Sequence, residues 1–484
     1  MFDFKNKIMK NITYKLLSVV VGLSLIVSSC NDELVQTDPQ ALSTDEALST
    51  FEGLQTALFG AYDGMQDLNW YGRDFIVIPE VGGDNVYIAI DNSNRFLQNW
   101  DYQLNSTNTQ TALWTDVYAT ILMVNNIIII IESGAVEIGP AEQADADLVL
   151  GEAYAIRAIA HFDLVRAFSQ QYTIDQNSPG VPVITEPLEP TAVPARNTVA
   201  EVYNQVDADL TRASGLLDNS QGPFRITKDA ITAMQARVAL YKGDYGTAKT
   251  LADQIINGGN YPLMSASLVQ DGWKIDGLSE EIFTLKFLTS ENRGSNNLGS
   301  IYIPSSYGDI RPSTDWRRLF DANLDGVGDD NDVRYSWVNN VDSGDGEYYQ
   351  YKYAGADGVD GLVSPKILRT SEMYLIAAEG TLETGADALP YLNTLRAARN
   401  ADPLTSADLA AIMDERSREL AFEGHRTFDL FRRGMTANRE QFIDEPGKHL
   451  TAPDVVPPQD FLRAYPIPQV ELDANTNMVQ NNGY

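Results

Sequence analysis

The chain has 484 residues and a formal charge of −32, with 67 acidic side chains against 35 lysine and arginine side chains. A surface this acidic argues against nucleic acid and anionic lipid headgroups as partners, because both repel it. The chain has three histidines and no HExxH, GxSxG, Walker A or GxGxxG pattern, so it carries none of these catalytic motifs. The composition therefore favours a binding protein over an enzyme.

The N-terminus has the pattern of a secretory signal. Four lysines precede an apolar run over residues 16–27, which is shorter than the ~20 residues that a membrane-spanning helix needs. The sequence VSSC then ends at Cys30, the one cysteine of the chain, as in the lipobox of bacterial lipoproteins. We predict a signal peptide over residues 1–29, a lipid on Cys30 as the attachment to the membrane, and a polar tether over residues 30–44. The alternative is a signal that is cut elsewhere, with an incidental cysteine.

Apolar side chains spaced three and four residues apart predict a mainly α-helical fold. The second of the predicted helices is apolar on several faces, and we interpret it as a buried helix and not as a membrane span. The remaining stretches lack a helical period and are expected to form loops with short strands, or an extended connection where prolines are dense. The predicted helices cover residues 45–62, 114–131, 150–168 and 198–217, the loops residues 69–108, and the extended connection residues 179–194.

Two further helix pairs carry a tetratricopeptide-like turn. The sequence GDYGTA, which begins at Gly243, fits the Gly-x-Tyr-x-x-Ala pattern between antiparallel helices, and a diverged copy surrounds Gly385. Between the two copies, residues 268–362 are dense in Gly, Asp, Asn, Trp and Tyr and have little helical period. We expect residues 45–484 to form one helical domain, and this loop-rich insert to bind the ligand, since such inserts usually carry function.

The C-terminal third carries the most specific pattern. Residues 415–434, ERSRELAFEGHRTFDLFRRG, fit the signature R-x-x-E-L-x-x-E-G-x-R-x-x-D-L-x-R-x-G. The closing segment YPIP…QNNGY and the pattern Trp114-x-x-x-Tyr118-x-x-Ile121-x-x-x-Asn125 fit the same family. With the lipobox included, the chain resembles the SusD/RagB family over essentially all of residues 30–484.

The resemblance implies an outer-membrane lipoprotein that faces the cell exterior. Its fold would be mainly α-helical, with tetratricopeptide-like helical pairs packed against an irregular, loop-rich subdomain that contains short strands. It would capture oligosaccharides or polysaccharides and deliver them to a SusC-like TonB-dependent transporter, without breaking a bond and without a required cofactor. The RagB branch of the family implies peptides or another nutrient instead. Glu419, Arg426 and Asp429 of the signature are expected to form a charged network at a helix junction.

Sugar binding needs flat apolar side chains for the C–H faces of the rings, with polar groups alongside for the hydroxyls. Five of the six tryptophans lie in irregular segments, and Trp100 and Trp316 are the first candidates, because the family draws its binding aromatics from those regions. The alternative for each residue is packing beneath a long loop. The acidic surface slightly favours a neutral polysaccharide. The full set of candidate ligand-binding residues is Trp70, Tyr71, Arg73, Asn94, Trp100, Trp273, Tyr302, Tyr307, Trp316, Trp337 and Tyr349.

One acidic loop, residues 321–332, fits the calcium-loop template, in which oxygen ligands at alternate positions surround a hard cation. Two features depart from that template: Asp332 stands where a bidentate glutamate is usual, and residues 333–337 have the pattern of a strand and not of an exiting helix. A structural Ca²⁺ is therefore a hypothesis, and its alternative is an acidic, glycine-rich loop without an ion. The ligands would be Asp321, Asn323, Asp325, Val327, Asp329 and Asp332.

Overall fold

The computed structural model describes residues 44–92, 94–189, 191–326, 328–339, 347–439, 453–457 and 460–484. The predicted signal peptide, Cys30 and the tether up to residue 43 lie outside the described residues, as does Val327. Residues Thr50–Tyr484 form one compact unit, and the short helix α2 (Thr44–Ala47) lies outside it.

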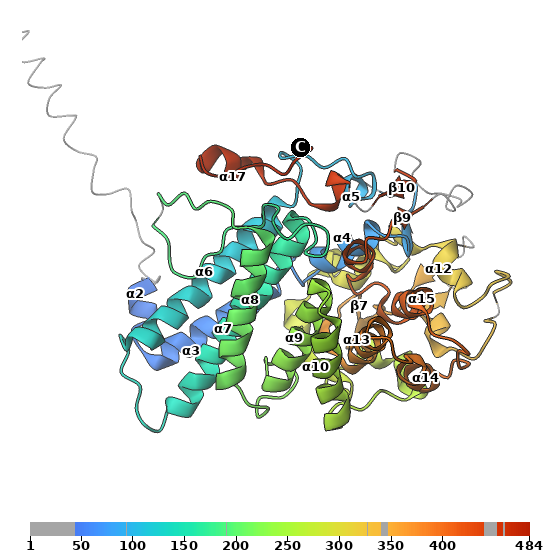
Figure 1. Ribbon diagram of the computed structural model, residues 1–484, viewed down its shortest axis with the longest axis horizontal. Coiled ribbons are helices and arrows are strands. Elements are labelled where there is room, and N and C mark those ends of the chain that lie inside the picture. The colour runs from blue at the N-terminus through green and yellow to red at the C-terminus, as the bar shows by residue number, and fades with distance from the viewer. Residues whose placement is uncertain are drawn as a thin grey trace, which may run out of the picture. The chain divides into compact units, whose positions relative to one another are not determined.

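Long helices build the frame of this unit, which confirms the mainly α-helical prediction. In Figure 1, α3, α6, α7 and α8 lie side by side, and α9, α10, α13 and α14 continue the array. The helices of the frame are α3 (Phe51–Met65), α6 (Thr111–Ser133), α7 (Gln143–Phe168), α8 (Val199–Leu216), α9 (Lys228–Lys242), α10 (Tyr245–Gly258), α13 (Thr370–Glu383), α14 (Leu389–Ala398), α15 (Leu409–Leu420) and α16 (Arg426–Arg432).

The helix ends follow from local sequence. The Thr198 hydroxyl accepts a hydrogen bond from the Glu201 backbone N–H while the Glu201 carboxylate accepts one from the Thr198 N–H, a capping box that fixes the start of α8. Gly243, with a φ of 73°, ends α9, and the Asp244 side chain caps α10. The tetratricopeptide-like turn predicted at Gly243 is therefore confirmed.

Helix α6 is long and apolar enough to cross a membrane by length and composition alone. It packs against α3 and α7, and its buried residues include Trp114, Val117 and Ile121. Its apolar character is that of a core helix, as the sequence indicated.

Three local predictions were wrong. Residues 69–108 contain the helix α4 (Asp74–Val81) in addition to loops, β1 (Val86–Ile88) and α5 (Leu97–Trp100). Residues 75–81 of α4 are all buried, so the helix has no solvent-exposed polar face. Its sequence therefore shows no helical period of apolar residues. The first frame helix begins at Phe51, capped by Thr50, and not at residue 45. Residues 333–337 form the 3₁₀ helix η5 (Val333–Trp337) instead of a strand, because the Asp332 carboxylate caps the Arg334 N–H.

The insert and the C-terminal segment consist of short elements. The strands pair in two-stranded antiparallel sheets: β1 with β3, β2 with β8, β4 with β5, β6 with β7 and β9 with β10. Their bounds, with those of the short helices, are α11 (Ala266–Val269), η1 (Gly272–Lys274), β2 (Glu281–Thr284), η2 (Thr289–Glu291), η3 (Gly294–Asn296), η4 (Leu298–Ile301), β3 (Ile310–Pro312), α12 (Thr314–Arg318), β4 (Val338–Asn339), β5 (Tyr349–Gln350), β6 (Gly355–Ala356), β7 (Val359–Asp360), β8 (Lys366–Arg369), β9 (Ala437–Asn438), β10 (Val455–Val456), η7 (Phe461–Arg463) and α17 (Gln469–Ala474).

The signature residues are structural, as expected. The Glu419 carboxylate is buried among arginines, Asp429 pairs with Arg416 at 2.9 Å, and Arg426 pairs with Asp84. The Arg416–Asp429 pair joins α15 to α16, and the other pairs join these helices to further segments of the chain, so the prediction of a charged network is confirmed.

Candidate functional site

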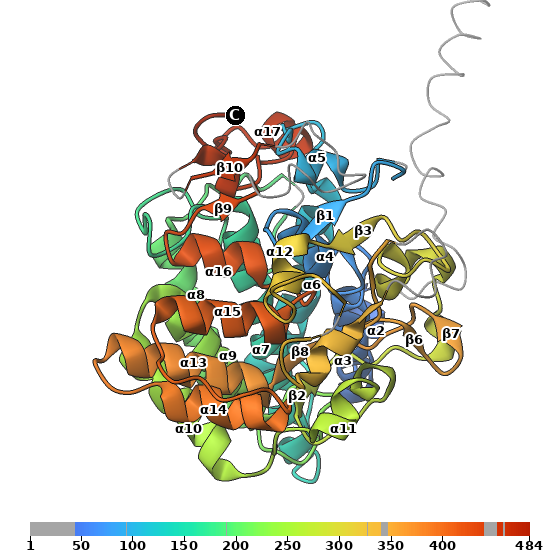
Figure 2. The same cartoon turned by 90° about the vertical axis from the view of Figure 1, so that its right-hand side faces the viewer.

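A cluster of two aromatic and three polar side chains lies where the loop after β1 meets the segment before β3. Antiparallel pairing of β1 with β3, with Ile88 opposite Ile310, brings these two segments together (Figure 2). The Ala89 N–H donates to the Asp309 carbonyl at 3.0 Å and extends the contact into the loop. The members are Arg73, Arg95, Phe96, Asn296 and Tyr307, which we call the surface cluster.

Tyr307 is held from two sides. Its hydroxyl donates to Ser295 Oγ at 2.9 Å, and Cζ of Arg95 lies 3.2 Å from the centroid of its ring. The hydrogen bond to Ser295 lowers the pKa of Tyr307, with a further contribution from Arg95. The ring is partly exposed.

The second aromatic ring, Phe96, is also partly exposed and carries a guanidinium beside it. Cζ of Arg73 lies 5.4 Å from the Phe96 centroid, within the range of a cation–π contact. The Arg73 Nη1 donates to Asn296 Oδ1 at 3.0 Å. Arg73 precedes α4 and Asn296 ends η3, so these contacts join both segments to the loop after β1.

The loop after β1 has an unusual backbone. Asn94 and Phe96 have φ angles of 67° and 56°, in the left-handed region that side chains with a Cβ rarely adopt. The Asn92 side chain fixes the loop, since its Oδ1 accepts from the Arg95 N–H at 2.7 Å and its Nδ2 donates to the Arg95 carbonyl at 2.8 Å. Strained backbone that is held in place by its surroundings is typical of ligand-binding loops.

The two arginines of the surface cluster are each balanced by a carboxylate. Arg73 Nε lies 2.6 Å from Asp74, and Arg95 Nη1 lies 2.8 Å from Asp309. Burial raises the pKa of Asp309, although the hydrogen bond from Arg95 opposes that rise. The arginines therefore offer hydrogen-bond donors without adding net positive charge.

Of the residues predicted from the sequence, Arg73 and Tyr307 belong to the surface cluster, and Asn94 is exposed on the same loop as Arg95. The structure corrects the expectation for the others, because a buried ring offers no face to a ligand. The buried candidates are Trp70, Tyr71, Trp100, Trp273, Tyr302, Trp316, Trp337 and Tyr349.

Trp100 and Trp316, the first candidates from the sequence, show how these aromatic side chains are buried. Trp100 and Trp316 are each 1% exposed. The indole N–H of Trp316 donates to the Ser417 carbonyl at 2.9 Å, and Trp100 lies against the Arg439 guanidinium, 4.1 Å from its ring centroid. Irregular segments have no sheet or long helix to supply a core, so large aromatic side chains fill the space beneath them.

Sequence reasoning missed Arg95, Phe96 and Asn296. The signal that could have found the first two is the run DNSNRF at residues 91–96, a polar turn that ends on an aromatic residue. Asn296 has no such signal, because only the contact with Arg73 brings it into the surface cluster.

Several carboxylates of the acidic loop at residues 321–332 form hydrogen bonds or ion pairs within the protein itself. Asp321 accepts hydrogen bonds from the Gly326 N–H at 2.8 Å and from the Tyr335 hydroxyl at 3.0 Å. Asp332 pairs with the buried Arg334 at 2.6 Å, and Asp329 accepts from the Ala322 N–H at 2.8 Å. Within the described ranges no group of three or more Asp, Glu, His or Cys side chains is arranged to hold a metal ion. The donor set thus does not fit the calcium hypothesis.

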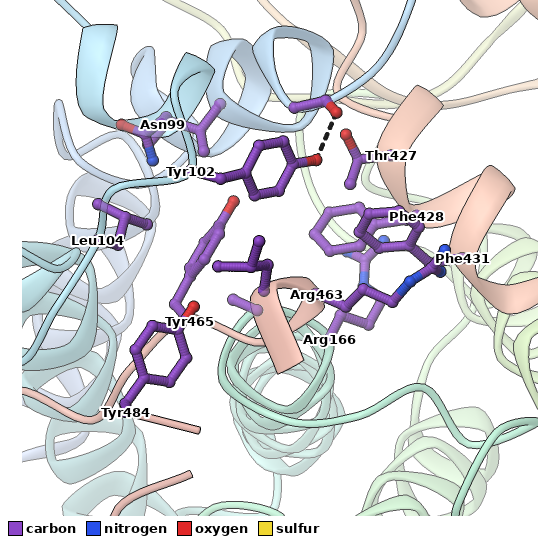
Figure 3. Close-up of a pocket in the computed structure, with 14 residues that line it drawn as sticks. Asn99, Tyr102, Leu104, Arg166, Thr427, Phe428, Phe431, Arg463, Tyr465 and Tyr484 are labelled. Carbon is purple, nitrogen blue, oxygen red and sulfur yellow. Dashed lines mark hydrogen bonds between the residues drawn. The ribbon is translucent and has the colours of Figure 1, made fainter. Parts of the chain in front are cut away.

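A small cavity lies elsewhere, lined by Asn99 of α5 and by Phe428 and Phe431 of α16 (Figure 3). Tyr102, Tyr465, Tyr484 and Arg463 surround it, and the Tyr102 hydroxyl donates to the Gly82 carbonyl at 2.6 Å. Its volume of about 20 Å³ has room for water and not for a sugar ring.

His161 also has a structural role, as predicted. It is fully buried, its Nε2 accepts from the Ile184 N–H at 3.2 Å, and its Nδ1 lies 3.0 Å from the Arg157 carbonyl. Both ring nitrogens have partners in the protein, so the ring is not placed to act on a ligand.

Comparison with known proteins gives a consistent result. Residues 257–484 match the SusD family, and residues 35–240 match a family described as starch-binding and associating with the outer membrane. SusD-like protein P38 of Formosa agariphila is 24% identical to the chain, over 96% of this chain and 98% of that protein.

Two solved structures are similar over most of their length. A putative sugar binding protein of Bacteroides vulgatus is 29% identical with a TM-score of 0.82, and the match covers 90% of this chain and 99% of that one. A SusD superfamily protein of Bacteroides thetaiotaomicron is 29% identical with a TM-score of 0.81, over 89% of this chain and 99% of that one.

Proposed function

The chain belongs to the SusD family, and from this premise we propose that it captures oligosaccharides or polysaccharides at the outer membrane. The observation that carries the proposal is the surface cluster, in which partly exposed Tyr307 and Phe96 rings lie among the donors of Arg73, Arg95 and Asn296. Aromatic rings beside fixed polar groups are what a sugar needs, since it presents C–H faces and hydroxyls together.

In this proposal a pyranose ring stacks on Tyr307 or Phe96, and its hydroxyls accept hydrogen bonds from the arginines. The donors are already positioned by their own ion pairs and by Asn296, so little side-chain entropy is lost on binding. Because Asp74 and Asp309 balance the charges of Arg73 and Arg95, a neutral glycan fits this site better than a polyanionic one.

We also propose that no bond is broken at this site. A glycosidase needs one carboxylic acid that protonates the leaving group and one carboxylate that acts as base or nucleophile. Asp74 and Asp309, which lie beside the surface cluster, are each paired with one of its arginines. Such pairing favours binding over catalysis.

The bound glycan would then pass to a SusC-like TonB-dependent transporter. This part of the proposal rests on the family alone, as does attachment of the protein to the outer surface of the membrane through a lipid on Cys30. The lipid can be tested by feeding an expressing Gram-negative host with labelled palmitate. The label and the membrane location should both be lost in Cys30→Ala, and a variant that keeps both would contradict the anchor.

The first experiment is affinity electrophoresis of the purified protein through gels that contain neutral or acidic polysaccharides. We expect one neutral polymer to retard the wild-type protein and Tyr307→Ala or Phe96→Ala to abolish the retardation. Phe59→Ala, which removes a 56% exposed ring on α3, is the matched control and should migrate like the wild type. Absence of retardation by every polymer would contradict glycan capture and favour the peptide-binding branch of the family.

A further inference from the structure

A groove with a volume of about 440 Å³ lies between α6, the proline-rich connection after α7, and α17, which lies above α6 in Figure 1. This volume is within the range of small-molecule sites, and the groove shares no lining residue with the surface cluster. Its walls are mainly apolar and include Trp114, Tyr118, Leu122 and Leu188.

Hydrogen bonds hold the walls of this groove in place. The Tyr118 hydroxyl donates to the Pro182 carbonyl at 2.8 Å, the Asn125 Nδ2 donates to the Ile184 carbonyl at 3.1 Å, and the Asn475 Nδ2 donates to the Pro194 carbonyl at 2.7 Å. Side chains of α6 and of the chain just after α17 thus fix both ends of the proline-rich connection. The groove is formed before any ligand arrives, which reduces the cost of binding.

Apolar side chains are exposed at this groove. Leu122 is 44% exposed and Leu188 is 40% exposed, and both belong to its lining. Covering such side chains removes apolar surface from water, which favours binding. A ligand with an apolar body would therefore gain free energy here.

Glu471 is the one charged residue among the described residues that line the groove. It is half-buried, and burial raises the pKa of its carboxyl, while a hydrogen bond from the Trp114 side chain opposes that rise. Among the described residues no lysine, arginine or histidine forms an ion pair with Glu471. Arg196 acts electrostatically on the neighbouring Tyr118, but its guanidinium donates to backbone carbonyls, including those of Gly180 and Pro179.

We propose that this groove binds a small organic cation, an ammonium group on an apolar body, with the ammonium against Glu471 and the body along the exposed Leu122 and Leu188. An ammonium supplies the counter-charge that Glu471 lacks among the described lining residues. The net charge of −32 further raises the local concentration of cations. This site is independent of the glycan site.

The test uses three probes of equal chain length, n-hexylamine, n-hexanol and hexanoate, each titrated into the purified protein by isothermal calorimetry. The amine should bind about tenfold or more tightly than the alcohol, since hydrogen bonds to charged groups contribute about 1.5–3 kcal/mol. Hexanoate should bind most weakly. An alcohol that binds as tightly as the amine would overturn the assignment, as would an amine that shows no binding.

Two variants and one control locate the site. Glu471→Gln should reduce the affinity for hexylamine to that of hexanol, whereas Asp473→Asn, an equal change of charge on the exposed face of α17, should leave it unchanged. Ala119→Trp, at an exposed position of α6 in the groove wall, should block all three probes without disturbing the core. Equal losses in Glu471→Gln and Asp473→Asn would mean general charge attraction and would contradict the proposal.

Discussion

The Arg399 guanidinium and the Glu419 carboxylate form a buried ion pair, with an Nη2–Oε1 distance of 2.8 Å. Arg334 and Arg369 contact the same carboxylate. One glutamate on α15 therefore holds three arginines that come from the end of α14, from η5 and from the end of β8. Through this residue the loop-rich insert is attached to the helical frame.

Glu419→Gln should strongly destabilise the protein, because it leaves three buried arginines with less compensating charge. We expect the free energy of unfolding to fall by about 3–5 kcal/mol, as for other broken buried pairs. Urea unfolding followed by circular dichroism measures this change.

The control for that measurement is Asp271→Asn, which removes an ion pair with Lys274 whose side chains are 61% and 44% exposed. An exposed pair contributes about 1 kcal/mol or less, so this variant should stay close to the wild type. If the free energy of unfolding fell by the same small amount in both variants, the network around Glu419 would not hold the insert.

Stability should fall as the pH drops from 6.5 towards 4, because two histidines are buried in the neutral form. Burial lowers the pKa of His161 to about 3, with a further contribution from Arg157, and burial lowers the pKa of His425 to about 4. The unfolded chain takes up protons below its histidine pKa of about 6.5 whereas the folded chain does not. The stability that the two neutral histidines contribute is therefore complete above about pH 6.5. It is lost progressively as the pH falls towards their folded-state pKa values of about 3 and about 4.

Each histidine can contribute a slope of at most about 1.4 kcal/mol per pH unit between pH 6 and 4.5. The measurement is the free energy of unfolding in urea at pH 7, 6, 5 and 4.5. His161→Gln should reduce the slope by up to about 1.4 kcal/mol per pH unit, because this group no longer titrates. An unchanged slope in this variant would show that His161 does not cause the loss of stability at low pH.

The helical frame could be predicted from the sequence because each helix has local signals of its own. Helix α8 shows an apolar period and a capping box at Thr198, and the turn at Gly243 needs the left-handed backbone that glycine provides. Helix α4 could not be predicted in this way. Its residues are buried on every side, and only tertiary packing distinguishes it from a buried strand.

The candidate site was only partly predictable. Arg95 and Tyr307 are far apart in the sequence, and the pairing of β1 with β3 brings them together. No local pattern fixes the pairing of two three-residue strands. Burial of Trp100 and Trp316 could not be predicted either. An aromatic residue in a loop has the same sequence signal whether its side chain faces solvent or packs beneath the loop.

Removal of calcium should leave the protein unchanged. Asp332 is paired with Arg334, and Asp321 holds the turn through backbone N–H groups, so the loop is closed by its own hydrogen bonds. We expect equal melting temperatures in excess EGTA and in millimolar Ca²⁺. A rise of several degrees with Ca²⁺ that disappears in Asp325→Asn would contradict this expectation and restore the calcium hypothesis.

Gly299→Ala should both destabilise the protein and weaken glycan binding. A Cβ at Gly299 would lie 1.9 Å from the Tyr353 carbonyl oxygen and 2.8 Å from Gly361 Cα, and neither backbone atom can move without displacing the β6–β7 hairpin. Overpacking of this kind costs about 1–3 kcal/mol or more. The same shift would reach the ligand site, because the Tyr307 N–H donates to the carbonyl of the neighbouring Ser300 at 2.9 Å.

Gly246→Ala is the matched control for this last prediction. A Cβ at Gly246, in the first turn of α10, meets nothing within 4 Å, and alanine is a better helix former than glycine by up to about 1 kcal/mol. This variant should be as stable as the wild type or more stable, with unchanged retardation in polysaccharide gels. Unfolding in urea and affinity electrophoresis separate the two effects of Gly299→Ala. A variant that loses stability but keeps full retardation would show that η4 does not position Tyr307, whereas loss of both supports one rigid path from Tyr353 through Gly299 to the ligand.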